Sequence, residues 1–337
     1  MFQTLSVSFT AVLSVACVIF AGFLLRRFGM LTKESDRGLL RLMINFLMPC
    51  LILDRVLFHD VFADPRNLYW PTLIGASQIT VGILLAGCVG FLPALWTGLT
   101  SRAKRGTFAT STGMLNYGFV PIALIPFLFP ESPATMGVLF VVGLGIEFTM
   151  WTLGLLMIQG KFDWHSAKNS INGPTVTILL AIPLNLWSHG SYFPPVLNEA
   201  TPYFAFLKQA VHLAGQAAIP LSIILVGASI ADAFRWERYR TGLKETAKIA
   251  FWTCLLRHLI LPAIILFAAY HLPCSLELKR VLVLHAAMGA AIFPIILAQH
   301  YGGDPDVALD SILSSSLLSL VTSPLWIAFG LQWVLRS

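Results

Sequence analysis

Long runs of apolar residues recur along the whole of this 337-residue chain. A helix needs about 20 apolar residues to cross the hydrocarbon core of a bilayer. Ten runs approach that length, and we expect each of them to span the lipid bilayer. They cover residues 5–25, 39–58, 69–93, 107–129, 134–159, 172–188, 205–231, 248–270, 281–300 and 307–332. The sequence therefore predicts an all-α membrane protein of ten transmembrane helices.

The charged residues lie mostly in the short connections between these runs. In a soluble protein, a net charge of +6 would suggest a nucleic-acid partner. Here the odd-numbered connections carry 14 of the Lys and Arg residues, whereas the opposite side and both termini carry five. Because cytoplasmic loops are enriched in Lys and Arg, we expect both termini to lie outside the cytoplasm. We expect a multi-pass protein of the plasma membrane, such as a bacterial inner membrane, with no nucleic-acid partner.

Similar proline-containing segments recur at a nearly constant distance along the chain. The pairs are Pro49 with Pro220, Pro121 with Pro294, and Pro133 with Pro305, at separations of 171, 173 and 172 residues. These separations map the first five helices, within residues 1–160, onto the last five, within 170–335. Because five is odd, the second half would enter the membrane from the opposite face. The pattern predicts a 5+5 inverted repeat, as in many secondary transporters; the alternative is chance agreement in a proline-rich chain.

Helices 4 and 9 of this scheme contain helix-disrupting residues at corresponding places. Paired interruptions of this kind point to a binding site near the bilayer midplane. The free N-terminus of a half-helix would favour an anionic substrate, and the Asn116 amide could donate to a carboxylate. The alternative is a pair of ordinary proline kinks that only shape packing. The predicted substrate-binding residues are Asn116, Tyr117, Gly118, Pro121, Met288, Gly289, Ala290 and Pro294.

Two ionisable residues lie in the middle of predicted spans, where charge is rare. Glu147 is either a hydrogen-bonded structural carboxyl or a proton or cation site. Arg257 could pair with Glu147, line the substrate path, or bond carbonyls freed by a broken helix. These alternatives leave coupling to Na⁺ or H⁺ undecided.

No arrangement of residues typical of catalysis is present. The sequence contains no nucleophile motif of the G-x-S-x-G type, no H-E-x-x-H and no phosphate-binding loop. The five cysteines are scattered and include no C-x-x-C pair, so neither disulfides nor a metal site are indicated. We therefore expect a protein that is not an enzyme, without catalytic residues, a metal or another cofactor.

Several segments, in their order and spacing, resemble the auxin efflux carrier family over almost the whole chain. They are AGFLLRRFGMLTKE at 21–34, NFLMP at 45–49, Arg257 five residues before Pro262, AAMGAAIFP at 286–294, AQHYGGDP at 298–305 and TSPL at 322–325. The resemblance implies the fold of the bile acid–sodium symporter superfamily. Where the family often has proline, this chain has Gly289.

The resemblance also implies a division of labour between the helices. Scaffold helices would lie within 1–60 and 172–232, and would form a homodimer. A mobile transport domain would lie within 66–160 and 245–335 and move by an elevator mechanism. The function implied is that of a carrier for a small organic anion, such as a dicarboxylate or an auxin-like acid, with export favoured over import. The alternative is a membrane-embedded sensor of the same fold, without net transport.

Overall fold

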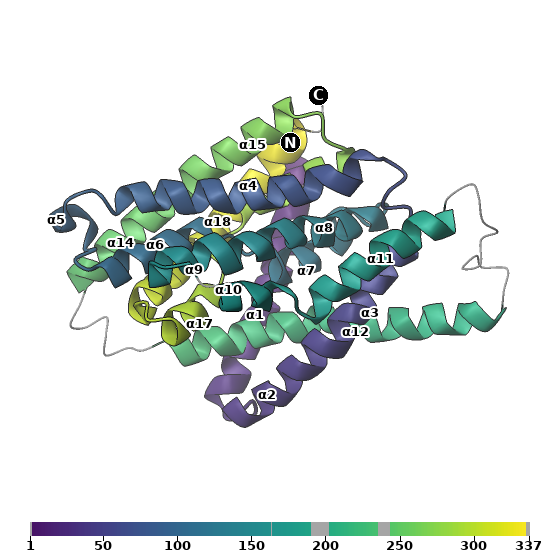
Figure 1. Ribbon diagram of the computed structural model, residues 1–337, viewed down its shortest axis with the longest axis horizontal. Coiled ribbons are helices and arrows are strands. Elements are labelled where there is room, and N and C mark those ends of the chain that lie inside the picture. The colour runs from purple at the N-terminus through teal and green to yellow at the C-terminus, as the bar shows by residue number, and fades with distance from the viewer. Residues whose placement is uncertain (1, 163, 190–201, 235–242, 335–337) are drawn as a thin grey trace.

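The computed structural model describes residues 2–162, 164–189, 202–234 and 243–334. Within these ranges the chain forms helices and their connections, with one isolated β-bridge. Four basic residues used to predict the orientation lie outside the described residues: Arg235, Arg238, Arg240 and Arg336. In Figure 1, α4 and α15 lie along one edge of the molecule and α2 and α12 along the other, with α6–α9 between them.

Four long helices run without a change of helical type: α1 (Phe2–Arg27), α4 (Arg66–Val89), α12 (Pro202–Ala233) and α18 (Pro305–Trp333). Three more contain π-helical turns. The first is α2 (Lys33–Leu42), which continues through η1 (Met43–Leu47), α3 (Met48–Ile52) and η2 (Leu53–Leu57). The second is α8 (Pro133–Thr149), which continues through η3 (Met150–Gly154) into α9 (Leu155–Gln159). The third is α14 (Leu243–Leu255), which continues through η5 (Leu256–Ile260) into α15 (Leu261–His271). The shorter helices are α5 (Ala94–Thr97), α10 (Trp164–Ala167) and α11 (Gly173–His189).

Within the described residues, six helices are long and apolar enough to cross a membrane. They occupy Thr4–Arg27, Arg66–Val89, Pro133–Gln159, Ala205–Asp232, Leu243–His271 and Pro305–Trp333. Two shorter apolar helices, Phe119–Leu128 and Gly173–Trp187, coincide with parts of further expected spans. The chain is therefore a multi-pass membrane protein, and the full set of ten spans stays a prediction.

The segments expected as helices 4 and 9 are both broken, as the sequence predicts. The first consists of α6 (Arg102–Gly113) and α7 (Phe119–Leu128), and the second of α16 (Leu276–Ala287) and α17 (Phe293–His300). The prolines act differently from interior kinks. Pro121 and Pro294 lie in the first turns of α7 and α17, where a missing N–H leaves no intrahelical bond unmade. They therefore begin the second half-helices.

Several helix pairs pack with their backbones in direct contact, and two of them, α1–α12 and α4–α8, show it most clearly. Gly227 of α12 faces Ile19 of α1, and an added Cβ would lie 1.9 Å from the Ile19 carbonyl oxygen. Gly145 of α8 meets Thr72 of α4 in the same way, also at 1.9 Å. Small residues allow such close approach in membranes, where packing rather than water exclusion drives helix association. The pairs α1–α12 and α4–α8 therefore depend on glycine.

An ionic cluster joins three helices at one end of the bundle. Arg26, at the end of α1, forms ion pairs with Asp36 of α2 and with Asp232 of α12, the latter with a 3.2 Å separation between Nε and Oδ1. Its Nη1 also donates to the Leu31 carbonyl oxygen at 2.6 Å. The cluster fixes the turn between α1 and α2 against α12.

Candidate functional site

The two broken helices cross at their interruptions and bond to each other there. The Asn116 N–H donates to the Gly289 carbonyl oxygen at 2.9 Å, and the Ala291 N–H donates to that of Met114 at 3.0 Å. Leu115 and Ala290 form the antiparallel bridge between the two segments. Backbone groups that each broken helix leaves unpaired thereby satisfy one another, as a low-dielectric interior requires. We call residues 114–118 and 288–292 the crossover.

The ends of the half-helices give the spacing between the two broken helices. α6 ends at Gly113 and α16 at Ala287, whereas α7 begins at Phe119 and α17 at Phe293, and both separations are 174 residues. The pairing of Pro121 with Pro294 implies 173 positions, one fewer. The bridge between residues 115 and 290 does not measure this spacing, because an antiparallel bridge pairs residues running in opposite directions.

Arg257 holds one strand of the crossover. Its side chain, from the π turn η5, is buried and donates Nη1 to the carbonyl oxygens of Thr112, at 3.5 Å, and Gly113, at 3.3 Å. These carbonyls lie at the end of α6, where no further helical turn is available to bond them. No ion pair joins Arg257 to a carboxylate among the described residues. Of the three roles considered for Arg257, the structure shows the bonding of carbonyls freed by a broken helix.

His258, the next residue, holds the other strand. Its Nε2 lies 3.1 Å from Ser315 Oγ, and Ser315 Oγ accepts the Ala290 N–H at 2.8 Å. Its Nδ1 lies 2.8 Å from Thr322 Oγ1. A neutral imidazole with its proton on Nδ1 fits all of these hydrogen bonds: Nδ1 donates to Thr322 Oγ1, and Ser315 Oγ donates to Nε2. We call Arg257, His258 and Ser315 the crossover clamp, because together they fix both strands.

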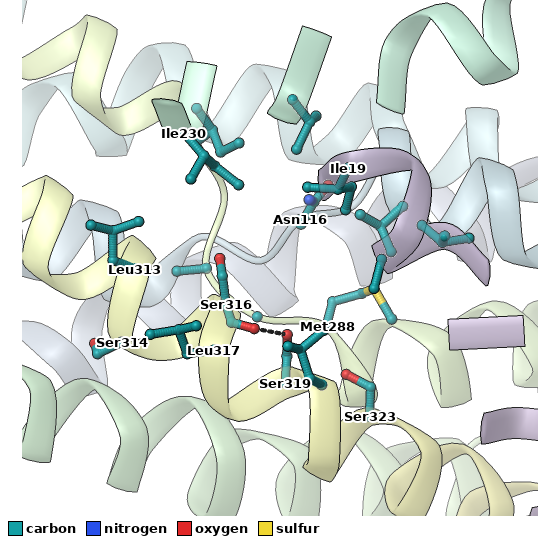
Figure 2. A pocket seen from close by; sticks show the side chains of 18 of the residues that line it. Ile19, Asn116, Ile230, Met288, Leu313, Ser314, Ser316, Leu317, Ser319 and Ser323 are labelled. Atoms are coloured by element: carbon teal, nitrogen blue, oxygen red, sulfur yellow. Dashed lines mark hydrogen bonds between the residues drawn. The ribbon is translucent and has the colours of Figure 1, made fainter. Parts of the chain in front are cut away.

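A cavity of about 640 Å³ adjoins one face of the crossover. Its walls come from α1, α12 and α18, and from Asn116 and the segment 288–292. Figure 2 shows Ile19 near Asn116, Ile230 from α12, and Leu313 and Leu317 along α18. We call this space cavity 1; it is mainly apolar, with polar groups concentrated on α18.

The polar wall of cavity 1 was not predicted from the sequence. It consists of Asp310, Ser314, Ser316, Ser319 and Ser323, and Ser319 Oγ donates to the Ser316 carbonyl oxygen at 2.7 Å (Figure 2). Asp310 is buried and accepts from Thr246 Oγ1 at 3.1 Å. The spacing of Ser316, Ser319 and Ser323 could have predicted this wall, because residues three to four positions apart lie on one face of a helix.

A second cavity, of about 380 Å³, adjoins the other face of the crossover. Its walls come from the helix that runs from α2 to η2, from α8 with η3, from the start of α11, and from crossover residues. Asn116 and Ile292 line both cavities. We call this space cavity 2; the crossover therefore separates two cavities and contributes to each.

Glu147 is the acidic group of cavity 2 and accepts three side-chain hydrogen bonds. Tyr117 Oη donates to Oε1, Trp151 Nε1 donates to Oε2 at 3.1 Å, and Asn172 Nδ2 approaches Oε2 at 3.5 Å. The donors come from the crossover, from η3 and from the residue just before α11. This carboxyl connects three elements around the cavity.

The eight predicted substrate-binding residues fall into four groups. Met288, Gly289 and Ala290 line cavity 1, Tyr117 and Gly118 line cavity 2, and Asn116 lines both. Pro121 and Pro294 line neither cavity and instead begin the half-helices. Gly289 is needed sterically, since an added Cβ would lie 2.9 Å from Ser315 Oγ.

The electrostatic character of the two cavities is set by what lines them. No Lys, Arg or His side chain of the described residues lines either cavity. In the described part of the chain, no three His, Cys, Asp or Glu side chains gather as they would around a metal ion. A bound anion would therefore meet the Asn116 amide and the N-termini of α7 and α17 rather than a cationic side chain.

Comparison with known proteins identifies the family. A family model described as membrane transport protein matches residues 7–172 and again residues 164–327. The chain belongs to this family. The match confirms the resemblance to auxin efflux carriers, and two successive matches are what a chain of two similar halves would give. The chain is also 28% identical, over 319 residues, to a protein of Methanothermobacter thermautotrophicus named as an uncharacterized transporter; the alignment covers 94% of this chain and 96% of that protein.

Proposed function

We propose that the protein is a secondary carrier for a small organic anion, with the crossover as its substrate site. The observation that carries the proposal is the pairing of two broken helices, whose interruptions line cavities on both of their faces. Membership of a membrane transport family supports a carrier rather than an enzyme. Cavities of about 380 and 640 Å³ fall within the size range of small-molecule sites.

An anion is the solute that the crossover suits best. The first N–H groups of α7 and α17 have no partner within their own helices, and helix N-termini carry partial positive charge. Asn116 adds an amide donor at the point shared by both cavities. The candidates are a dicarboxylate or an aromatic acid of the auxin type.

The proposed mechanism is an elevator movement within a ten-helix inverted repeat. The tight pair α1–α12 belongs to the proposed scaffold, and the tight pair α4–α8 belongs to the proposed transport domain. Each pair stays within one body, so the bodies can slide past each other while both pairs remain packed. We propose a homodimer formed by the scaffold. It would lie in a plasma membrane with both termini outside the cytoplasm, and the resemblance favours export over import.

Substitution of Asn116 tests the site. Full-length protein is reconstituted into liposomes, and uptake of labelled malonate, succinate and benzenesulfonate is measured. We expect Asn116→Ala to reduce transport of the accepted acid by about tenfold, which corresponds to roughly 1.4 kcal/mol, the loss of one hydrogen bond to a charged group. Asn45→Ala is the matched control, because Asn45 is exposed on α2–η1 and lines neither cavity.

The outcomes separate the alternatives. Reduced transport with unchanged thermal stability supports the assignment. Unchanged uptake and affinity in Asn116→Ala would remove Asn116 from the site. Binding of an acid without flux in the wild-type protein would instead indicate a sensor.

A further inference from the structure

Glu147 raises a problem for a carrier of anions. Its carboxyl lines the same cavity as Tyr117 and Gly118 of the crossover. Among the described residues lining cavity 2, Tyr117 is the only other titratable side chain, and it donates to Glu147. An ionised Glu147 would repel an anionic solute there, with no cationic side chain to offset it. A neutral Glu147 removes this repulsion.

The groups around Glu147 suit a proton better than a metal cation. A hard cation such as Na⁺ is bound by several oxygen ligands. Here Trp151 and Asn172 turn N–H groups toward the carboxylate, and the Asn172 oxygen already accepts the Thr175 N–H at 3.0 Å. These hydrogens would repel a cation placed beside Glu147. A proton needs no such ligand shell and can attach to either carboxylate oxygen.

The donors of Glu147 belong to two different bodies of the proposed carrier. Tyr117 and Trp151 lie, with Glu147 itself, within the proposed transport domain, residues 66–160. Asn172 immediately precedes α11, which belongs to the proposed scaffold. An elevator movement would therefore carry Glu147 away from Asn172 while keeping its other two donors. Hydrogen bonds to an ionised carboxylate favour that form, so losing one favours proton uptake.

We propose that Glu147 is a proton-binding site that couples proton movement to solute transport; this rests on the proposed carrier function. With Asn172 in place, the hydrogen bond from Asn172 favours the ionised form of Glu147 more than in its absence, and the proton leaves to the water in cavity 2. After the movement, Glu147 takes a proton from water on the opposite side and becomes neutral. The neutral carboxyl accompanies the bound acid, so one proton and one acid cross together, in the direction set by their summed gradients.

A pH gradient across proteoliposomes tests the proposal with full-length protein. The probe is whichever of malonate, succinate and benzenesulfonate the wild-type protein transports. For one proton per acid, with the membrane potential held at zero by K⁺ and an ionophore, a gradient of one pH unit supports about tenfold accumulation. We expect this in the wild type and in Glu131→Gln, where the carboxyl is exposed between α7 and α8. In Glu147→Gln we expect accumulation to disappear, while exchange of labelled for unlabelled acid at equal concentrations persists.

A purely structural Glu147 would give a different pattern. In that case Glu147→Gln loses exchange and accumulation together, which overturns the proposal. Accumulation by Glu147→Gln equal to that of the wild type, or accumulation that follows a Na⁺ gradient at equal pH, also overturns it. If the wild type transports an acid but no proton moves with it, the carrier function is supported and only the proton coupling is overturned. Absence of transport for every probe removes both.

A second variant keeps the test decisive if Glu147→Gln does not fold. Asn172→Ser retains a side chain that can cap α11 but removes the amide donor to Glu147. We expect its pH dependence of exchange to shift to higher pH, because Glu147 then holds its proton more tightly. A pH-sensitive dye inside wild-type liposomes should also report acidification as the acid enters. An unshifted profile together with no acidification overturns the proposal.

Discussion

Arg257 and His258 show how two adjacent side chains can fix a site between helices that are far apart in sequence. Arg257 bonds the end of α6, and His258 reaches Ala290 through Ser315. Adjacent residues of a helix point in different directions, so they reach different partners. The crossover clamp holds the crossover through these hydrogen bonds, and none of its three residues lines either cavity.

Removing the guanidinium should destabilise the protein. In Arg257→Met, the carbonyls of Thr112 and Gly113 lose a buried donor, and we expect a loss of about 1–3 kcal/mol of unfolding free energy. Arg37→Met is the control, because Arg37 is exposed on α2. Thermal unfolding in detergent measures both. Equal melting temperatures for Arg257→Met and the wild type would contradict the bonding role.

At the level of helices, glycines bring the backbones of certain helices into direct contact. Gly22 and Gly227 bring α1 and α12 together, and Gly75 and Gly145 do the same for α4 and α8. In each case an added Cβ would lie 2.2 Å or less from a carbonyl oxygen of the partner helix. Side-chain interdigitation is replaced by backbone contact, so neither pair can accept a methyl group without separating.

Alanine at these glycines should therefore be costly. We expect Gly227→Ala and Gly145→Ala each to lower the unfolding free energy by about 1–3 kcal/mol through overpacking. Gly38→Ala is the matched control, because nothing lies within 4 Å of its added Cβ. That change should be neutral or stabilise α2 by roughly 0.5–1 kcal/mol, as for any glycine inside a helix. Equal effects at all three positions would show that backbone propensity, rather than close packing, governs them.

Across the whole molecule, both cavities extend toward connections that carry basic residues. Cavity 1 reaches Phe234 and Thr246, on either side of residues 235–242. Cavity 2 reaches Asn169 and Asn172, close to Lys168. Since cytoplasmic connections are rich in Lys and Arg, the proposed orientation would place these ends of both cavities on the cytoplasmic side.

Labelling from each side of the membrane checks this orientation. We expect a membrane-impermeant maleimide to modify Asn169→Cys in inside-out vesicles and Glu131→Cys in right-side-out vesicles. The unsubstituted protein, with its five free cysteines, gives the background. The reverse pattern would place both termini in the cytoplasm and the two cavities on the outer side.

Local chemistry made much of this fold predictable from the chain alone. Apolar length marks the spans, because lipid excludes unpaired backbone and charge. Glycine and proline marked the breaks in helices 4 and 9, since both act within a turn of where they stand. Asn116 and Gly289 lie in these interruptions, as the sequence predicts, and their role in substrate binding stays a prediction.

Tertiary packing determined the contacts that the sequence did not predict. The bridge between Leu115 and Ala290, the bond from Arg257 to the end of α6, and the placement of Asp310 beside cavity 1 all join segments distant in sequence. Periodicity shows which residues share a helix face but not which other helix that face meets. Arg257 therefore had three possible partners in the sequence, and Asp310 had no predicted role. Their neighbours are set by how the broken helices cross.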